Sequence, residues 1–167
     1  YLRNMAQHFK FQGHQDGAYD VPYTTISTNL IQGGNAYNTI PGLCEFVFEI
    51  RNLVADNPEK LLQQIDDYIE AELLPTLQKE QLNTKIILEN LAQVPGLETA
   101  PSEPIVRAAQ LICHNEKQLK VAYATEAGLF QQAKISTIVC GPGSIEQAHR
   151  ANEFVALEQL HRCEQFI

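Results

Sequence analysis

The segment 43–53, LCEFVFEIRNL, alternates in the direction of its side chains when the chain is extended. One face carries Cys44, Phe46, Phe48 and Ile50, and the other carries Leu43, Glu45, Val47, Glu49 and Arg51. This period of two is typical of a strand with one buried face, because successive side chains of a strand point to opposite faces of the sheet. The segment therefore predicts a β-sheet with an apolar face that other elements cover.

The sequence on both sides supplies partners for this strand. Residues 23–32, YTTISTNLIQ, form a β-favouring run, and two glycines follow it. Upstream, residues 1–10 predict the end of a helix, and residues 12–22 predict a loop rich in Gly, Asp, Gln and His. A partner strand is therefore expected directly before Gly33 and Gly34.

A helix is predicted after residues 56–58, DNP, because Asp and Asn are start signals and proline is tolerated in the first turn. Its apolar stripe consists of Leu61, Leu62, Ile65, Ile69 and Leu73. Pro75 is expected to bend or end this helix, and residues 84–94 predict another strand. Residues 1–98 thus have the order αββαβ, which predicts an α+β domain with an antiparallel sheet.

The best domain boundary is the segment 94–104, VPGLETAPSEP, with its three prolines and a glycine. After it, Ser102 is expected to cap a helix, and residues 118–124 and 135–141 predict strands. Further helices are expected over residues 126–133 and 153–167. Residues 99–167 therefore have the order αβαβα and predict part of an α/β domain.

Composition argues against several classes of partner. The chain has 167 residues, of which 44% are apolar and 19% charged, as in globular proteins. Its net charge is -8 and its 12 Lys and Arg residues are scattered, so neither nucleic acid nor a membrane surface is expected as a partner. No apolar run approaches the ~20 residues of a membrane span, and no signal peptide is visible. The start at Tyr1, within a helical pattern, leads us to expect a longer protein.

The cysteines indicate a reducing compartment. They are Cys44, Cys113, Cys140 and Cys163, and none forms a CxxC pair. Each lies in an apolar stretch, so buried, reduced thiols in a cytoplasmic protein are expected.

The loop after residues 135–141 carries the first candidate site. It reads CGPGSIEQAH, and its glycines allow a sharp turn at the carboxyl end of an expected strand, where α/β proteins build their sites. His149 at its end is a candidate metal ligand, although a lone surface histidine is the simpler alternative. A thiol hydrolase with Cys140 paired to His149 is another alternative. The loop lacks the GxSxG serine motif and the phosphate-binding Gly-Lys-Ser/Thr motif.

Three further residues are candidates for substrate binding. Asn38 lies between the two expected strands, and Arg51 lies on the second, where its guanidinium suits a carboxylate. Thr125 stands where a strand meets a helix. Each also has a structural interpretation: an Asx-type turn for Asn38, an ion pair with Glu49 for Arg51, and a helix cap for Thr125.

Taken in order, GGNAYNTIP, EFVFEIR, ATEAGLFQ and GPGSIEQAH followed by EFV form a more specific pattern. This series resembles the acetylornithine deacetylase branch of the dimetal amidohydrolase and peptidase family, which also includes succinyl-diaminopimelate desuccinylase, aminoacylase and carboxypeptidase G. The resemblance runs from about Tyr23 onward. Two departures are Glu49, where the family has Asp, and Ala124, where it often has Gly.

The resemblance implies a fold and a set of roles. Residues 1–98 would be most of a ferredoxin-like α+β lid that makes a homodimer, and residues 99–167 the last part of the catalytic α/β domain. His149 matches a ligand of one of two zinc or cobalt ions. Asn38, Arg51 and Thr125 match substrate-binding positions. No catalytic residue can be assigned in this chain, and the general base and remaining ligands would lie outside it.

The implied activity is metal-dependent deacylation of an N-acyl amino acid, foremost N2-acetylornithine, which yields ornithine and acetate for arginine biosynthesis in the cytoplasm. These 167 residues alone are expected to be inactive. One alternative is another deacylase of the family, such as succinyl-diaminopimelate desuccinylase. Another is a dimerisation or binding module without catalysis, and a third is the thiol hydrolase with Cys140.

Overall fold

The computed structural model describes residues 1–114, 117–148 and 150–166. The chain divides into two compact units. The hairpin unit comprises Tyr1–Gln93 together with Lys120–Tyr123, and the second unit comprises Val94–Leu119 and Ala124–Ile167.

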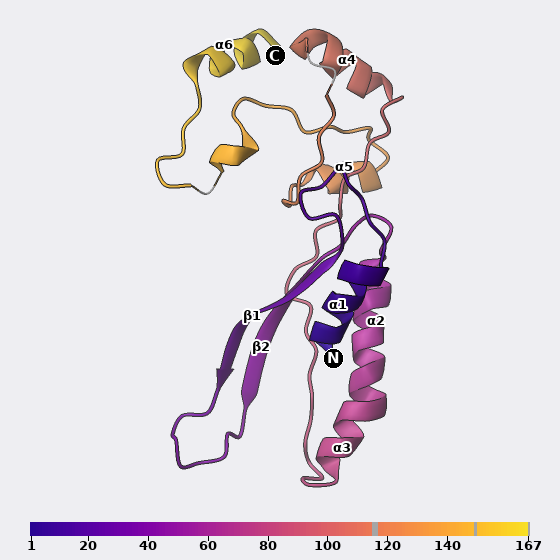
Figure 1. Ribbon diagram of the computed structural model, residues 1–167, viewed down its shortest axis with the longest axis vertical. Helices are drawn as coiled ribbons and strands as arrows, with labels where there is room; N and C mark the ends of the chain where they lie inside the picture. The colour runs from indigo at the N-terminus through magenta and orange to yellow at the C-terminus, as the bar shows by residue number, and fades with distance from the viewer. Residues whose placement is uncertain (115–116, 149, 167) are drawn as a thin grey trace. The chain divides into compact units, whose positions relative to one another are not determined.

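The hairpin unit consists of helices packed on an antiparallel hairpin. Helix α1 (Leu2–Gln12) precedes strands β1 (Thr25–Gly33) and β2 (Cys44–Arg51), and helix α2 (Pro58–Tyr68) follows (Figure 1). The register runs from the pair Thr25 and Arg51 to the pair Gly33 and Cys44, with an irregularity between Thr28 and Leu30. The two predicted strands and the α+β class are confirmed. A ferredoxin-like arrangement needs two further strands, and it stays a prediction.

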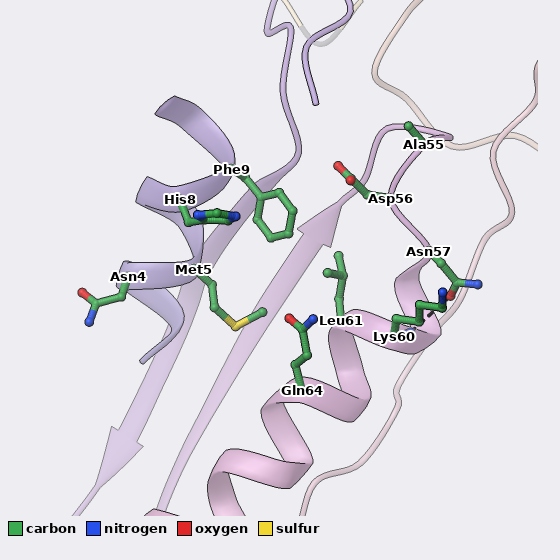
Figure 2. A pocket seen from close by; sticks show the side chains of 10 residues that line it. All are labelled: Asn4, Met5, His8, Phe9, Ala55, Asp56, Asn57, Lys60, Leu61 and Gln64. Atoms are coloured by element: carbon green, nitrogen blue, oxygen red, sulfur yellow. Dashed lines mark hydrogen bonds between the residues drawn. The ribbon is translucent and has the colours of Figure 1, made fainter. Parts of the chain in front are cut away.

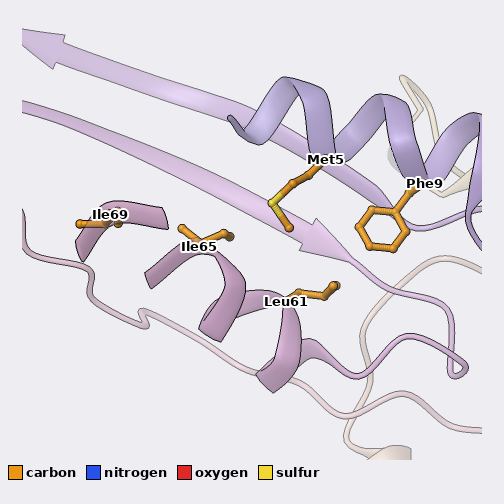
Figure 3. Packing of buried hydrophobic residues seen from close by; sticks show 5 residues of the cluster. All are labelled: Met5, Phe9, Leu61, Ile65 and Ile69. Carbon is orange, nitrogen blue, oxygen red and sulfur yellow. The ribbon is translucent and has the colours of Figure 1, made fainter. Parts of the chain in front are cut away.

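One apolar core joins the helices to the hairpin. Met5 and Phe9 of α1 meet Leu61 and Ile65 of α2 and Ile69 (Figure 3). Partly buried side chains complete this core: Leu2, Ile26, Phe48, Ile50, Ile86 and Leu88. The predicted helical stripe is thereby confirmed at its three buried positions.

The predicted buried face of the strand 43–53 is only half covered. Phe48 and Ile50 pack against the core, whereas Cys44 is exposed and Phe46 is 52% exposed. The prediction was wrong for Cys44 and Phe46. The buried side chains of α1 and α2 pack only against the part of the hairpin near its open end. The apolar face therefore continues uncovered toward the hairpin loop.

Helix α2 starts as predicted, and the helical chain continues beyond it past Pro75. The side chain of Asn57 accepts hydrogen bonds from the backbone N–H groups of Glu59 and Lys60 and so caps the helix. A π-helical turn, η1 (Ile69–Leu73), joins α2 to α3 (Leu74–Gln78). Proline has no N–H and its ring crowds the carbonyl four residues earlier, and the wider π turn accommodates this defect.

The segment 84–94 is extended but forms no strand ladder, so the strand prediction was wrong. Its side chains nevertheless alternate, with Ile86 and Leu88 turned toward the core and Lys85 and Ile87 exposed. The period of two in the sequence thus correctly predicted which side chains of this segment face the core. Strand pairing additionally needs a neighbouring backbone to receive its hydrogen bonds, and no such pairing is formed within the described residues.

The second unit contains short helices linked by extended chain. They are α4 (Pro104–Cys113), α5 (Ala127–Gln132), the 3₁₀ turn η2 (Ile145–Gln147) and α6 (Leu157–Phe166). The predicted helices are therefore present, with α4 beginning after Glu103 and not at Ser102. The predicted strands 118–124 and 135–141 were wrong, since the described residues form only the β1–β2 sheet. The expected α/β sheet is not formed within this part of the chain.

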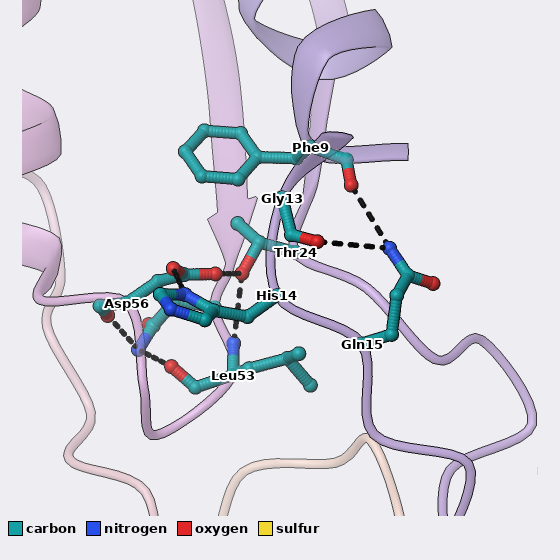
Figure 4. Close-up of polar contacts among 8 residues, drawn as sticks. Phe9, Gly13, His14, Gln15, Thr24, Leu53 and Asp56 are labelled. Atoms are coloured by element: carbon teal, nitrogen blue, oxygen red, sulfur yellow. Dashed lines mark hydrogen bonds and ion pairs between the residues drawn. The ribbon is translucent and has the colours of Figure 1, made fainter. Parts of the chain in front are cut away.

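A buried polar cluster closes the open end of the hairpin (Figure 4). Thr24 is completely buried, and its hydroxyl donates to Oδ2 of Asp56 at 2.5 Å and accepts from the N–H of Leu53 at 2.9 Å. Oδ1 of Asp56 lies 2.6 Å from Nδ1 of His14. These contacts join the chain before β1, the chain after β2 and the start of α2.

We expect Thr24→Val to loosen this junction. Valine has the shape of threonine but no hydroxyl, so the buried N–H of Leu53 loses its acceptor, at a cost of about 1–3 kcal/mol. Hydrogen exchange of the Leu53 amide should accelerate by roughly 5–30-fold or more. The control is Thr28→Val in the exposed part of β1, which should leave this amide unchanged. Equal protection in wild type and Thr24→Val would contradict the assigned role.

Candidate functional site

Arg51 ends β2 and holds its guanidinium between two oxygen partners. Its Nε lies 3.1 Å from Oε2 of Glu49, and its Nη1 donates to the carbonyl of Ala122 at 2.6 Å. The side chain remains 56% exposed. The ion pair that formed the structural alternative is therefore present, and the role of Arg51 in substrate binding stays a prediction. The carbonyl of Ala122 fixes the direction in which the guanidinium faces.

The segment that supplies this carbonyl is anchored to the hairpin unit through Lys120. Its Nζ lies 2.7 Å from Oδ2 of Asp16 and 5.4 Å from the ring centroid of Tyr19. The hydrogen bond from Lys120, helped by the backbone N–H of Ala18, lowers the pKa of the Asp16 carboxyl below its usual range. Residues 16–22 and 120–123 thus form a support beside Arg51.

Asn38 lies far from Arg51 along the same hairpin. It is exposed, in the loop that joins β1 to β2 beyond the pair Gly33 and Cys44. Strand β2 has 8 residues, and at the usual rise per residue its ends lie about 23 Å apart. One small molecule therefore cannot contact Asn38 and Arg51 of the same chain.

Thr125 lies in the second unit and supports the start of α5. Its Oγ1 accepts a hydrogen bond from the N–H of Ala127 at 3.1 Å, although the capping position itself is Glu126. The next residue, Gly128, is buried, and a Cβ there would lie 2.1 Å from the carbonyl oxygen of Pro95. Thr125 therefore supports the start of α5 from one position before the N-cap, so its prediction as the capping residue was wrong. Its contact with a substrate stays a prediction.

His149 lies outside the described residues, so its role as a ligand stays a prediction. The loop leading to it is shaped by Gly143, whose φ of 105° favours glycine, and by Ser144, whose Oγ accepts from the N–H of Glu146 at 3.3 Å. Gln159 of α6 donates to the carbonyl of Gly143 at 3.2 Å. Residues 1–114, 117–148 and 150–166 contain no group of three His, Cys, Asp or Glu that could hold a metal ion.

Cys140 is a poor candidate for a thiolate nucleophile. Its Sγ lies 3.6 Å from Sγ of Cys113, and desolvation together with this neighbouring thiol raises the pKa of Cys140. A higher pKa leaves less thiolate at neutral pH, whereas catalytic cysteines have a lowered pKa. The burial predicted for the thiols was wrong, because Cys44, Cys113 and Cys140 are exposed and only Cys163 is half-buried. All four are free, as expected.

Sequence reasoning missed the pair of His14 and Asp56. Asp56 is 7% exposed and was recognised only as a helix start signal. The two residues are 42 positions apart, and neither lies in a motif, so no local signal indicated their contact. Asp56 also lines a hollow of about 420 Å³ between α1 and the start of α2, together with His8, Lys60 and Gln64 (Figure 2). No helix in the described part of the chain is long and apolar enough to cross a membrane.

Comparisons with known proteins agree with this fold. Residues 2–77 match the family described as the peptidase dimerisation domain. The chain is 36% identical over 159 residues to the acetylornithine deacetylase of Pasteurella multocida, which covers 95% of this chain and 39% of that relative. It is 33% identical over 153 residues to the acetylornithine deacetylase of Myxococcus xanthus. This alignment covers 89% of this chain and 38% of that relative. The acetylornithine deacetylase of Proteus mirabilis is 36% identical over 143 residues. This alignment covers 85% of this chain and 35% of that relative.

Residues 2–77 are therefore similar to the peptidase dimerisation domain. The chain as a whole is a relative of the acetylornithine deacetylases, which are hydrolases, and the resemblance in its motifs is confirmed. It spans less than two fifths of the length of these curated relatives, at 39%, 38% and 35%.

We expect Lys120→Gln to raise the pKa of Asp16 toward the ordinary Asp value of about 3.9, because the principal donor to its carboxylate is lost. A lowered folded-state pKa means that the contact stabilises the fold above the ordinary value and is lost as pH falls through the lowered one. NMR titration of the Asp16 carboxyl measures the change. The control Lys85→Gln removes the same charge from an exposed position and should leave Asp16 unchanged. An unshifted Asp16 in Lys120→Gln would argue against the contact.

Proposed function

We propose that this chain is part of an amidohydrolase that deacylates an N-acyl amino acid, foremost N2-acetylornithine, as in arginine biosynthesis. The observation that carries the proposal is the extent of similarity to the Pasteurella multocida acetylornithine deacetylase, over 95% of the chain at 36% identity. The alignment is long enough to include both the hairpin unit and the loop before His149. The proposal therefore rests on both units and not on a single motif.

In this proposal Arg51 binds the carboxylate of the substrate. Its guanidinium is exposed, and the carbonyl of Ala122 orients it from one side. A substrate carboxylate would compete with Glu49 for the remaining donors and gain two parallel charge-assisted hydrogen bonds. Thr125 is likewise proposed as a substrate-binding residue. The pair with Glu49 would keep the guanidinium in place while no substrate is bound.

Asn38 enters the site from a second copy of the chain. Since about 23 Å separate the ends of β2, Asn38 and Arg51 can contact one ligand only if they come from different chains. The distal hairpin, which we define as residues 28–47, exposes Leu30, Ile31, Phe46 and Val47, with Ile31 at 73%. An apolar surface next to open strand edges suits pairing with an identical hairpin. The dimerisation domain family of residues 2–77 supports a homodimer.

The metal requirement is part of the same proposal. The described residues do not by themselves supply a ligand set, so His149 would be one ligand of zinc or cobalt, and the others would come from chain outside these residues. A bound ion of this kind activates water and polarises an amide carbonyl. A cytoplasmic location is also proposed, in keeping with four free cysteines.

The first test is hydrolysis by the intact protein. N2-acetylornithine should be cleaved to ornithine and acetate, N-succinyl-diaminopimelate should be cleaved less well, and a chelator should abolish both reactions. Preference for the succinylated substrate would assign the chain to the second deacylase class. Absence of hydrolysis with both substrates and added zinc would favour a binding module without catalysis.

Arg51→Lys should lower kcat/KM for N2-acetylornithine by roughly 10–100-fold, because lysine keeps the charge but loses the planar pair of donors. The comparison variant is Arg107→Lys, the same change at an exposed position of α4, which should retain wild-type kcat/KM. Amide exchange of Leu53 reports whether the hairpin unit remains folded in each variant. Wild-type activity of Arg51→Lys would contradict carboxylate binding at this residue.

A site shared between two chains predicts complementation. Asn38→Ala and Arg51→Ala should each be nearly inactive, and mixing the two after subunit exchange should restore about a quarter of wild-type activity. Half of the dimers are then mixed, and each mixed dimer holds one site with both residues intact. Residues acting from the same chain would give no recovery.

A monomeric variant provides the control for this experiment. Ile31→Asp places a charge on the distal hairpin and should shift the protein to monomers in sedimentation velocity, with loss of the recovery. Leu82→Asp, at another exposed position, should leave both the dimer and the recovery intact.

A further inference from the structure

Two cysteines of the second unit lie side by side. Sγ of Cys113 is 3.6 Å from Sγ of Cys140, although the residues are 27 positions apart in the sequence. Cys113 is the last residue of α4, and Cys140 directly precedes Gly141 at the start of the glycine loop. Neither residue belongs to the substrate or metal positions proposed above. The pair therefore requires an explanation of its own.

The geometry is close to that of a disulfide. A disulfide has its sulfurs about 2.05 Å apart, so these sulfurs need to approach by about 1.5 Å, which side-chain rotation can supply. Both residues are exposed, so a small oxidant can reach them. His114, which follows Cys113, has a φ of 50° and ends α4, so Cys113 lies at the C-terminal end of the helix.

We propose that Cys113 and Cys140 are a redox pair that closes to an intramolecular disulfide when a low-molecular-weight disulfide is the oxidant. This inference does not depend on the proposed deacylase activity. It assigns to the second unit a modification site that ties the end of α4 to the base of the loop 141–148.

The exchange proceeds in two balanced steps. In the first, a cysteine thiol loses its proton, its sulfur attacks the oxidant, and one small thiolate leaves, which gives a mixed disulfide. In the second, the other cysteine loses its proton, attacks the protein sulfur of the mixed disulfide and releases the second small thiolate. Each protein sulfur is oxidised by one electron, and the oxidant is reduced to two thiols after protonation.

Both steps of the exchange need a thiolate. Desolvation and the neighbouring thiols raise the pKa of Cys140, so less of its thiolate is present at neutral pH. The sulfur that takes up the small thiol has its resolving partner 3.6 Å away. Because the thiolate fraction grows with pH, closure should accelerate as pH rises.

The remaining cysteines serve as internal controls. Cys163 on α6 lies close enough to influence Cys140 electrostatically, but it is half-buried, whereas both members of the pair are exposed. Cys44 belongs to β2 of the hairpin unit. Specific pairing of Cys113 with Cys140 is therefore distinguishable from general oxidation of exposed thiols.

The test treats the intact protein with glutathione disulfide, blocks the remaining thiols with iodoacetamide, and maps the peptides by mass spectrometry. We expect one cross-linked peptide pair, Cys113 with Cys140, a mass lower by two hydrogen atoms, and full reversal by dithiothreitol. Cys113→Ser and Cys140→Ser should each abolish the cross-link, whereas Cys44→Ser should leave it unchanged. In Cys140→Ser a glutathione adduct should accumulate on Cys113.

Three outcomes would overturn the inference. They are glutathione adducts in the wild type without closure, a cross-link of Cys140 to Cys163 in place of Cys113, and an unmodified pair under conditions that oxidise Cys44. Each outcome is read from peptide masses, so a failure of the deacylase proposal cannot be mistaken for a failure of the redox pair.

Discussion

The hydroxyl of Thr24 is the point on which the hairpin unit depends. It is completely buried, and it donates to Asp56 while accepting from the N–H of Leu53. A buried carboxylate without such partners would cost several kcal/mol, so Asp56 is tolerated only because Thr24 and His14 satisfy it. Asp56 in turn precedes the capping residue Asn57, which starts α2. One side chain outside every helix and strand thus connects both ends of the hairpin to the start of α2, which carries Leu61 and Ile65 of the apolar core.

Local patterns in the sequence predicted local structure well. The alternation in residues 43–53 predicted β2, and the spacing of Leu61, Ile65 and Ile69 predicted the face of α2 that meets the core. The same alternation failed at Phe46, because the face of a strand is buried only where another element covers it. The strands predicted at 84–94, 118–124 and 135–141 failed for a related reason: a ladder depends on a partner backbone, which the pattern of one segment cannot supply.

The candidate site was predictable in residue type but not in arrangement. The chemistry of a guanidinium pointed to Arg51, and its partners Glu49 and Ala122 became known only from the fold. Glu49 is two residues away and could be anticipated, whereas the carbonyl of Ala122 is 71 positions away. The contacts of His14 with Asp56 and of Cys113 with Cys140 also bridge long separations that carry no motif. Sequence patterns thus do not predict long-range contacts between residues that belong to no motif.

The length of β2 also bears on the choice between an enzyme and a dimerisation module. These two interpretations compete only if the site is complete within one chain. A strand is stiff and nearly straight over 8 residues, so its two ends, Cys44 and Arg51, remain about 23 Å apart, and Asn38 lies in the loop beyond Cys44. If both residues serve one substrate, the pairing of two hairpins is itself a step in building the site. The apolar side chains exposed on the distal hairpin would then stabilise the dimer and position Asn38 together, and dimerisation would be a requirement of catalysis.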